Sequence, residues 1–564
     1  MEEKKLHTEK TLTPSALGRV GLDDVPHRWD MIIIGGGITG AGILREAARA
    51  GLSALLLERS DFAWGTSSRS SKLVHGGLRY LKEGRLLLTK TAVEERERLL
   101  AEAPGLVEPL GFLMPLYKHQ SPGKIILGAG LTLYDFMAAE THHRFFEREE
   151  FSTLLPRVKK RNLTGGYRFF DAQVDDARLV LRLMHEAVAE GACALNYVAA
   201  REILRNVRGK TVGVAAEQSG TSKNKNFFAP VIINATGAWA EALHRSPDAA
   251  VHLRPLRGSH IVFPAWRLPI AQAVSVIHPA DNRPVFMIPW EGAVLVGTTD
   301  LDHEQDLSAE PAATDEEINY LIEGLREYFP SISTDPENAI CTFAGVRPVL
   351  SEGKHPPSEE SRDHVVWVDR GLVTVTGGKL TTFRRLALGA LKAAEPFLPG
   401  GITLDRTAPV FSPPPKIPAD CHGLTPQVWR RLAGRYGDGA RTLVQNVAPE
   451  DLQTIPGTAT IWAEIPFVSR YEGIRHLDDL LLRRLRLGLL LPEGATEQLD
   501  KIRALCKSVL PWDKKRWRDE ERRYREILRQ AYRPPGKPAS PPADGIQILT
   551  EKLHVFLKKM LPGR

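Results

Sequence analysis

The most regular hydrophobic pattern of the chain lies between Asp30 and Arg59. Met31 to Ile34 is a short apolar run rich in branched residues, which is typical of a strand buried on both faces of a parallel sheet. A glycine-rich turn follows, and residues 38–50 then have the length and spacing of a helix. Ala54 to Leu57 is a second apolar run. The order strand, turn, helix and strand predicts a βαβ unit.

The turn of this unit carries the pattern G-x-G-x-x-G at Gly35, Gly37 and Gly40. These glycines permit a sharp turn, let the backbone approach a pyrophosphate, and allow the helix to pack closely on the strand. The N-terminus of the helix then faces the phosphates. Glu58, directly after the second strand, can accept both hydroxyls of an adenosine ribose, which favours FAD or NAD over NADP. The alternative is a structural βαβ unit without a ligand.

A segment rich in hydroxyl groups follows the βαβ unit. Thr66, Ser67 and Ser68 stand close together, and the pair Gly76-Gly77 allows another backbone to come near. Such a segment can lie along a flavin diphosphate and end beneath the flavin ring. A polar surface loop is the alternative interpretation.

A later strand helps to decide between FAD and NAD, the two cofactors that Glu58 leaves open. Residues 230–239 read PVIINATGAW, an apolar strand that ends in Ala235, Thr236 and Gly237. Flavoproteins with two dinucleotide-binding domains use such a strand to bring the backbone under the FAD. Its distance from the first glycine turn, with insertions between, argues against a simple NAD dehydrogenase and favours FAD.

The middle of the chain is rich in predicted strands. Residues 258–264, 285–290 and 294–300 alternate with turn residues, which suggests an antiparallel sheet that could serve as a substrate platform beside a flavin. Thr314 and Glu317 have the spacing of a capping box at the start of a helix.

Residues 373–385, VTVTGGKLTTFRR, repeat the opening theme in a shorter form. A strand leads to Gly377-Gly378 and then to a helix start that carries Lys379 and Thr381. A glycine pair at a helix N-terminus is an anion site by the dipole argument, and it would suit the electron-rich edge of a reduced flavin. A plain left-handed turn is the alternative.

Two helical regions bear on membrane contact. Residues 125–137, IILGAGLTLYDFM, are apolar but too short to span a bilayer and contain Asp135, so we expect a buried helix rather than a membrane-dipping one. Residues 546–561 are predicted to form a last helix with an apolar stripe and lysines elsewhere. That helix could seek a membrane surface or dock on its own protein.

Bulk composition excludes few classes of protein. The 564 residues are too many for one core, and 43% hydrophobic with 25% charged residues is ordinary for a globular protein. A net charge of +7 suits acidic ligands or an anionic membrane surface, although such an excess is most often only a solvated surface. The four cysteines have no metal-like spacing, so we expect a reduced compartment, no cysteine chemistry and no metal site.

Taken together, the motifs resemble the FAD-dependent, respiratory glycerol-3-phosphate dehydrogenases of the D-amino-acid-oxidase-like flavoprotein superfamily. The matching segments, from Asp30 to about Ala390, read IIIGGGITGAG, TSSRSSKLVHGGLRYL, VDDARLVL, INATGAW, RGSHIVFP, FMIPW, VGTTD, GVRP and TGGKLTTFR. LDDLLLRRLRLGLLL, within residues 476–491, resembles the C-terminal helical domain of that family more loosely. The first 28 residues and the tail after Arg533 lie outside the resemblance.

The resemblance implies FAD as cofactor and an α/β fold with two dinucleotide-binding (Rossmann-like) parts, an inserted antiparallel-sheet substrate domain and a C-terminal helical domain. The implied domains are a flexible leader at 1–28, a discontinuous FAD-binding domain at 29–110, 166–253 and 341–395, a substrate domain at 111–165 and 254–340, a linker at 396–418, a helical domain at 419–533, and a proline-rich linker with an amphipathic tail helix at 534–564.

The resemblance also assigns the residues that would bind the cofactor. They are Gly35, Gly36, Gly37, Ile38, Thr39, Gly40, Glu58, Arg59, Thr66, Ser67, Ser68, Lys72, Leu73, Gly76, Gly77, Val198, Ala235, Thr236, Gly237, Gly378, Lys379, Leu380 and Thr381.

The implied substrate is sn-glycerol 3-phosphate, oxidised to dihydroxyacetone phosphate by hydride transfer to flavin N5. Its dianionic phosphate needs fixed cations, and Arg79, with Tyr80 beside it, and Arg347 match positions that hold the substrate. Lys379, by family position near the flavin, could stabilise negative charge on the reduced ring or bind the substrate phosphate. His260 is the expected general base, because a neutral imidazole can accept the hydroxyl proton. Arg347 hardly deprotonates, so we assign it to orientation and to stabilising the developing alkoxide.

The family passes its electrons to membrane quinone while resting peripherally on the inner face of the cytoplasmic membrane. We therefore expect a membrane quinone and an anionic membrane surface as partners, no nucleic acid, and a cytoplasmic, peripheral location; a homodimer stays open. Two alternatives remain: a related amine or amino-acid oxidase that uses oxygen, and a catalytically silent flavin-binding protein.

Overall fold

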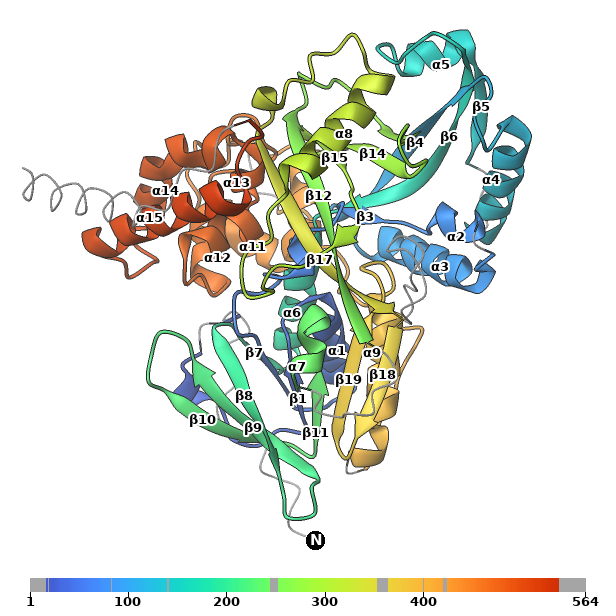
Figure 1. Cartoon of the computed structure of the whole chain (residues 1–564). Coiled ribbons are helices and arrows are strands. Elements are labelled where there is room, and N and C mark those ends of the chain that lie inside the picture. The colour runs from blue at the N-terminus through green and yellow to red at the C-terminus, as the bar shows by residue number, and fades with distance from the viewer. Residues whose placement is uncertain are drawn as a thin grey trace, which may run out of the picture.

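The computed structural model describes residues 17–18, 20–82, 84–138, 142–243, 252–351, 364–398, 400–418 and 423–536. The tail helix expected at 546–561 lies outside these residues. In Figure 1 a nucleotide-binding layer lies at the bottom, a large sheet lies above it, and the C-terminal helices, coloured orange to red, pack on one side. The α/β class with a C-terminal helical part is confirmed.

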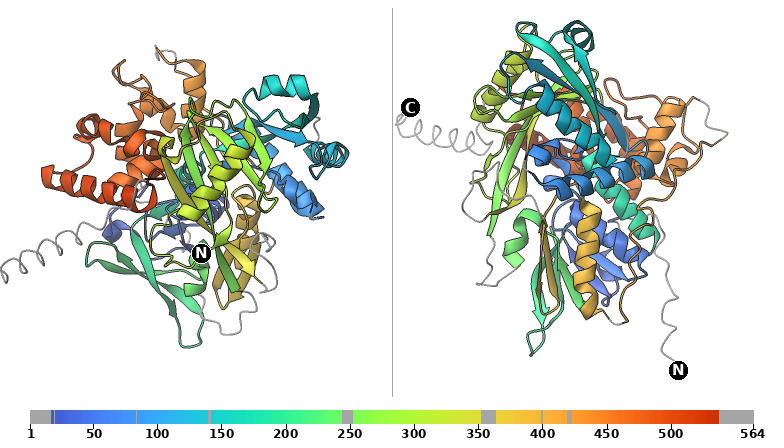
Figure 2. Two further views of the ribbon diagram at one scale, coloured as in Figure 1. Left: turned by 45° about the horizontal axis from the view of Figure 1, so that its top comes forward. Right: turned by 90° about the vertical axis from the view of Figure 1, so that its right-hand side faces the viewer.

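The lower layer of the described chain is a six-stranded sheet in the order β18-β19-β11-β1-β2-β7. All neighbouring pairs in this sheet are parallel except β18 with β19, which is antiparallel. Its strands are β1 Met31–Ile34, β2 Ala54–Leu57, β7 Cys193–Leu195, β11 Val231–Asn234, β18 His364–Asp369 and β19 Leu372–Gly377. Helices α6 (Asp176–Ala189) and α9 (Phe383–Ala394) both pack against α1 (Ile38–Arg49) beside this sheet (Figure 2, right). This arrangement is the predicted dinucleotide-binding fold.

A smaller sheet extends the lower layer, and the end of the expected leader packs near it. Strands β8 (Val198–Arg205), β9 (Thr211–Gln218) and β10 (Asn224–Phe228) are antiparallel. Leu22 and Val25 are buried, and Lys225 Nζ donates to the carbonyl of Val25 at 2.6 Å. The expectation of a loose leader is therefore wrong for residues 20–28, because this segment covers apolar surface of the nucleotide-binding layer.

The upper layer is a ten-stranded sheet, again counted over the described residues, and its central order is β16-β12-β15-β14-β13-β4-β6-β3. Strand β17 pairs with β12, and β5 pairs with β6. The bounds are β3 Leu73–Val74, β4 Val107–Tyr117, β5 Arg144–Glu147, β6 Leu163–Val174, β12 His252–Pro264, β13 Ala273–Ile277, β14 Pro284–Trp290, β15 Ala293–Gly297, β16 Leu301–Asp302 and β17 Cys341–Ser351. The expected FAD-binding segment at 341–395 thus begins inside this sheet, because β17 is hydrogen-bonded along the length of β12.

Six further α-helices of the described chain accompany the two sheets. They are α2 Leu78–Lys82, α3 Leu86–Glu102, α4 Lys124–Ala138, α5 Arg148–Leu154, α7 Ala240–Leu243 and α8 Asp315–Tyr328. The capping box of α8, formed by Thr314 and Glu317, is confirmed. The expectation that α4 is buried is wrong for one of its faces, since Ile125 is 86% exposed and Phe136 is 82% exposed. No helix among the described residues is both long and apolar enough to cross a membrane.

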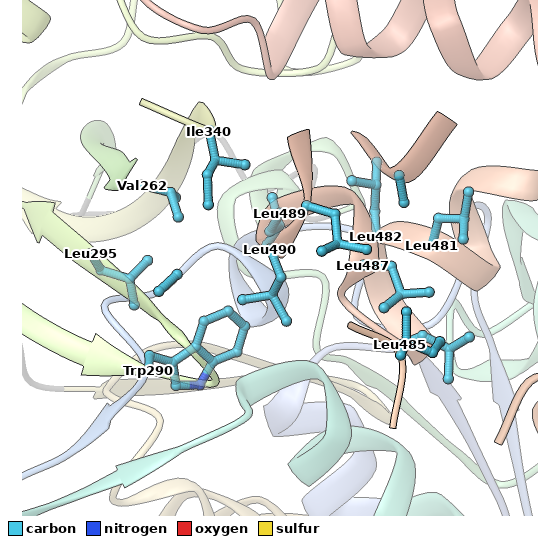
Figure 3. Close-up of a cluster of buried hydrophobic side chains, with 14 of the residues drawn as sticks. Val262, Trp290, Leu295, Ile340, Leu481, Leu482, Leu485, Leu487, Leu489 and Leu490 are labelled. Atoms are coloured by element: carbon cyan, nitrogen blue, oxygen red, sulfur yellow. The ribbon is translucent and has the colours of Figure 1, made fainter. Parts of the chain in front are cut away.

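The C-terminal part is helical, as predicted. Its helices are α10 Pro426–Tyr436, α11 Gly439–Val444, α12 Glu464–Tyr471, α13 Leu487–Leu490, α14 Leu499–Cys506 and α15 Lys514–Ala531. The leucine-rich segment 476–491 is not one helix: Asp479–Arg484 is a π-helix, and Arg486 has a left-handed backbone with φ +63° before α13. Figure 3 shows Leu489 and Leu490 of this segment on the side of the cluster that faces Trp290 of the large sheet. The connection at 400–418 is also anchored, because Arg45 Nε donates to the carbonyl of Val410 at 2.8 Å.

Buried ion pairs join the C-terminal part to the nucleotide-binding layer. Asp61 accepts from Arg484 through both carboxylate oxygens, at 2.5 and 2.7 Å, and from Arg483 Nε at 2.5 Å. Arg178 of α6 pairs with Glu472 at 2.6 Å. All five side chains are fully or almost fully buried, so each charge depends on its partner.

These contacts predict how Asp61 affects stability in acid. Burial alone would raise the pKa of Asp61, but Arg484 and Arg483 hold it at about 2, below its ordinary value of 3.8. The stabilisation is therefore complete above about pH 4 and is lost as the pH falls toward 2, with a size of about 2 kcal/mol. We expect Asp61→Asn to lower the thermal midpoint at pH 7 and to lose less stability than the parent chain between these pH values.

Glu217→Gln is the matched control for this experiment. Its partner Arg201 is 60% exposed, and exposed pairs contribute little. Thermal unfolding followed by circular dichroism gives the midpoints, and equal midpoints for Asp61→Asn and the parent chain at pH 7 would contradict the assigned role.

Candidate active site

The glycine turn after β1 is closed by direct contact with the end of β11. Gly35 has φ +112°, and a Cβ on it would lie 2.6 Å from the carbonyl oxygen of Ala235. A Cβ on Gly40 would lie 1.9 Å from the carbonyl oxygen of Gly35. Only glycine fits either position, so the turn and the Ala-Thr-Gly strand form one backbone surface.

The hydroxyl-rich loop lies at the N-terminus of α1. Ser67 Oγ accepts from the N–H of Ile38 at 2.9 Å, and Gly37 caps the helix without a side chain. Thr66 donates its hydroxyl to the carbonyl of Val346 in β17, which ties the loop to the large sheet. The residues predicted to hold the pyrophosphate, including Gly36, Thr39 and Ser68, therefore lie in one region, where first-turn N–H groups are available to an anion.

Glu58 occupies the position expected of a ribose ligand. Its carboxylate accepts the N–H groups of Gly36 at 2.6 Å and Ser60 at 2.7 Å, and its carbonyl accepts the N–H of Val198 at 2.8 Å. Burial raises the pKa of Glu58, against the lowering effect of these N–H groups and of Arg59. Each carboxylate oxygen keeps acceptor capacity for a ribose hydroxyl. The Arg59 guanidinium lies 5.0 Å from the Trp239 ring centroid.

The Ala-Thr-Gly turn and the second glycine pair end neighbouring parallel strands. Ala235 donates its N–H to the carbonyl of Ile34 at 2.8 Å, and Thr376 Oγ1 donates to the carbonyl of Gly237 at 3.0 Å. The carboxyl ends of β1, β11 and β19 therefore meet at one edge of the sheet. This edge is where open α/β sheets bind their ligands.

The segment after the second glycine pair also meets the residues on both sides of Gly76-Gly77. His75 donates its N–H to Thr381 Oγ1 at 3.2 Å. Lys379 Nζ lies 3.5 Å from the Tyr80 ring centroid, and Tyr80 is 2% exposed. The structure thus brings together two of the three residues predicted to bind substrate. Leu380 follows in the same segment and is half-buried.

Two site residues have different surroundings from those expected. Lys72 is fully buried, and its Nζ donates to Asp176 at 2.8 Å and to the carbonyl of Ser68 at 2.7 Å, so its side chain supports the cofactor loop from behind. Burial lowers the pKa of Lys72 to about 8, although Asp176 opposes the shift. Arg79 lies in α2 (Leu78–Lys82), but its side chain is outside the described part of the structure.

The structure adds two carboxylates that sequence reasoning did not assign to the site. Asp176 Oδ2 accepts from Ser70 Oγ at 2.7 Å as well as from Lys72. Asp171 Oδ1 accepts the N–H of Gly76 at 3.2 Å and the hydroxyl of Tyr134 at 2.7 Å. Asp176 stands within the VDDARLVL motif, next to Asp175, which caps α6.

His260 lies in β12, between Gly297 of β15 and Phe343 of β17. The imidazole stacks on Phe343 at 4.7 Å, and Nε2 lies 2.9 Å from Ser71 Oγ. Nδ1 is buried and has no hydrogen-bond partner among the described residues. Burial, helped by Lys72 and Arg347, lowers the pKa of His260 to about 3, so the ring is neutral at physiological pH. Such a nitrogen can accept a proton from a ligand.

Arg347 lies in β17, the strand that pairs with β12 beside His260. The Nη2 atom of Arg347 lies 3.1 Å from Asp300 Oδ1 and donates to the carbonyl of Thr299 at 3.3 Å. Arg283 lies 3.3 Å from the other oxygen of Asp300. Two guanidiniums therefore share one carboxylate, and the three side chains together carry a net positive charge.

The residues present fit FAD. The glycine contacts leave a backbone cradle that no Cβ can enter, Glu58 stands at the ribose position, and Gly76 and Gly378 lie where the hydroxyl-rich loop and the second glycine pair meet. Within the described residues, no group of His, Cys, Asp and Glu side chains could hold a metal ion. The arrangement can hold a flavin dinucleotide with a cationic, histidine-bearing sheet beside it.

The close approach at Gly40 gives a direct test of the cofactor cradle. We expect Gly40→Ala to lose most of its flavin on purification, because the new Cβ would overlap the carbonyl of Gly35. The absorbance of bound flavin per protein chain measures this. Gly130→Ala in α4 is the control, since no atom lies within 4 Å of its added Cβ. Full flavin occupancy in Gly40→Ala would contradict the cradle.

Comparisons with known proteins agree with this geometry. The family model for FAD dependent oxidoreductase matches residues 30–384, and the model for the C-terminal domain of alpha-glycerophosphate oxidase matches residues 394–517. The aerobic glycerol-3-phosphate dehydrogenase of Bacillus subtilis is 39% identical over 65% of this chain and 67% of its own length. The enzyme of the same name from Staphylococcus aureus is 32% identical over 81% of this chain and 86% of its own length.

A solved structure of the glycerol-3-phosphate dehydrogenase from Bacillus halodurans, complexed with FAD, is also similar. It has a TM-score of 0.71 and 26% identity, and the match covers 91% of this chain and 96% of that one. The use of FAD, which the glycine pattern together with the later Ala-Thr-Gly strand favours, is thereby confirmed. The chain belongs to the FAD-dependent oxidoreductases and, among them, to the aerobic glycerol-3-phosphate dehydrogenases.

Proposed function

We propose that the protein oxidises sn-glycerol 3-phosphate to dihydroxyacetone phosphate and passes the electrons to a membrane quinone. The observation that carries the proposal is the buried, neutral His260 beside Lys72 and Arg347, on the large sheet where it meets Ser71 of the hydroxyl-rich loop. The named relatives act on the same substrate by their printed names.

When bound, FAD would supply the oxidising power, as the acceptor of the hydride that leaves C2 of the substrate. The protein must then remove the hydroxyl proton and hold the phosphate. His260 serves as the proton acceptor, and Nδ1 is the atom available for it. Because the pKa of His260 is low, the imidazole is entirely neutral at physiological pH, but its protonation costs free energy. A dianionic phosphate bound nearby would raise that pKa toward the useful range.

Cationic groups at the site suit a phosphate ester. Arg347 and Arg283 share the charge of Asp300, which leaves one net positive charge on the group. Arg347 stays protonated, so it orients the substrate and stabilises negative charge that develops on its oxygen. Lys379, with Tyr80 beside it, and Arg79 are proposed to hold the phosphate. The assignments of these roles rest on the family resemblance and on the positions of the described groups.

The electron acceptor and the location belong to the same proposal. A quinone is dissolved in the bilayer, so the enzyme must reach the membrane surface to be reoxidised. We propose a peripheral attachment to the inner face of the cytoplasmic membrane, with anionic lipid as partner. The net charge of +7 supports attraction to such a surface.

Anaerobic titration of the flavin distinguishes the proposal from its two alternatives. We expect glycerol 3-phosphate to bleach the flavin absorbance in a ratio of one substrate per flavin, whereas amino acids should leave it oxidised. Bleaching by amino acids would indicate the related oxidase, and a flavin that no substrate bleaches would indicate a silent binding protein.

His260→Ala tests the general base. We expect the rate of flavin reduction by glycerol 3-phosphate, measured by stopped flow, to fall by at least about a hundredfold, the usual size for loss of a general base. The flavin content should not change, because no predicted cofactor contact is removed. His27→Ala, on the exposed surface near β10, is the control and should reduce at the parent rate. A parent-like rate in His260→Ala would remove it from the mechanism.

A further inference from the structure

Exposed apolar side chains gather on two neighbouring helices. In the described part of the chain, large apolar residues with high exposure cluster at the start of α3 and along α4; we call them the α3–α4 face. The face consists of Leu86 at 49% exposure, Leu87 at 82%, Ile125 at 86%, Ile126 at 70%, Leu133 at 40% and Phe136 at 82%. Helices α2, α3 and α4 pack against one another, on the side of the molecule opposite the C-terminal helices (Figure 1).

Helix α4 is apolar on both sides, but only one side is covered. Leu127, Leu131 and Tyr134 are buried against the large sheet and α3. Ile125, Ala129, Leu133 and Phe136 recur at helical spacing on the other side and are exposed. A helix that is hydrophobic all round is normally enclosed by protein or by lipid. The uncovered side therefore indicates a further apolar environment.

Lysines border this face. Lys124 begins α4, is 53% exposed and pairs with the exposed Glu147 at 3.2 Å, and the only acidic residue of α4, Asp135, is buried and paired with His143. Lys90 lies one turn after Leu86 and Leu87 on α3 and is exposed, as is Lys118 before α4. An apolar centre with lysines at its border matches an anionic bilayer, because lysine stems can lie along the acyl region while their ammonium groups reach lipid phosphates.

The face also lies directly behind the flavin loop. Tyr134, on the buried side of α4, donates to Asp171, and Asp171 accepts the N–H of Gly76 in the loop assigned to the flavin. A helix is about 10 Å across, so the uncovered side of α4 lies roughly one helix diameter from Gly76. Figure 2 (right), turned so that this side faces the viewer, shows α3 and α4 in front of the sheet.

We propose that the α3–α4 face is the membrane-contacting surface and inserts its apolar side chains into the interface of an anionic bilayer. The inference deepens the proposed function, on which it rests, by naming the surface that brings the flavin loop to membrane quinone. A second copy of the chain would place the border lysines of two molecules against each other, which makes lipid the favoured occupant.

The test uses the full-length holoenzyme with the substitutions Ile126→Glu and Phe136→Glu combined. Both side chains are exposed, so the fold and the flavin should be retained. We expect binding to phosphatidylcholine vesicles that contain phosphatidylglycerol, measured by co-sedimentation, to weaken by at least about tenfold, because two apolar side chains leave the bilayer. Trp266→Glu, at an exposed apolar residue away from this face, is the matched control and should bind as the parent does.

A second variant and two readouts make the result decisive. Lys90→Glu with Lys124→Glu should weaken binding to anionic vesicles. Glycerol 3-phosphate oxidation with a water-soluble dye as acceptor should be unchanged in all variants, whereas oxidation with quinone in vesicles should fall. If the parent chain showed no turnover with the dye, the proposed function itself would be wrong. Parent-like vesicle binding by both variants would overturn the inference. A shift from dimer to monomer in sedimentation, with vesicle binding retained, would overturn it in favour of a contact between copies.

Discussion

The buried carboxylate of Asp176 is the contact on which the cofactor loop depends. It accepts from Ser70 and Lys72 of that loop and pairs with Arg486 of the C-terminal part, while Arg486 also donates to the carbonyl of Ser68 at 3.0 Å. Removing one partner from a buried ion pair costs about 3–5 kcal/mol, because the remaining charge is left uncompensated. The loop that carries the predicted flavin contacts therefore keeps its shape only while the C-terminal part is docked.

This constraint explains why a helical region far from the reaction belongs to the same unit. Asp61 and Asp175 of the nucleotide-binding layer are buried, and Arg484 and Arg435 of the C-terminal part neutralise them. In the opposite direction, Glu472 of the C-terminal part is neutralised by Arg178 of α6. The leucines around Arg486 add apolar contact with Trp290 of the substrate sheet (Figure 3). The apolar packing supplies stability, and the ion pairs fix the position of the loop.

Local chemistry made the cofactor fold predictable from sequence. The backbone geometry of the turn requires glycine at Gly35 and Gly40, and the strand, helix and acid around them occur in a fixed order. The nucleotide-binding layer and FAD could therefore be predicted. His260 is different: in isolation a strand histidine suggests nothing, and only its match to a family motif marked it. Asp176 was missed because its role depends on Arg486, which only the folded chain brings near. The catalytic and substrate-binding roles stay predictions.

Helix α4 shows a second limit of sequence reasoning. Its run of apolar residues was interpreted as a buried helix because hydrophobicity reports only that a side chain avoids water. Protein and lipid satisfy that demand equally, since lipid tails are as apolar as leucine. The distinction requires knowing which side of the helix the fold covers: Leu131 and Tyr134 face protein, whereas Ile125 and Phe136 do not. An apolar segment too short to span a bilayer can therefore still lie against one, and its depth is set by the border lysines rather than by its length.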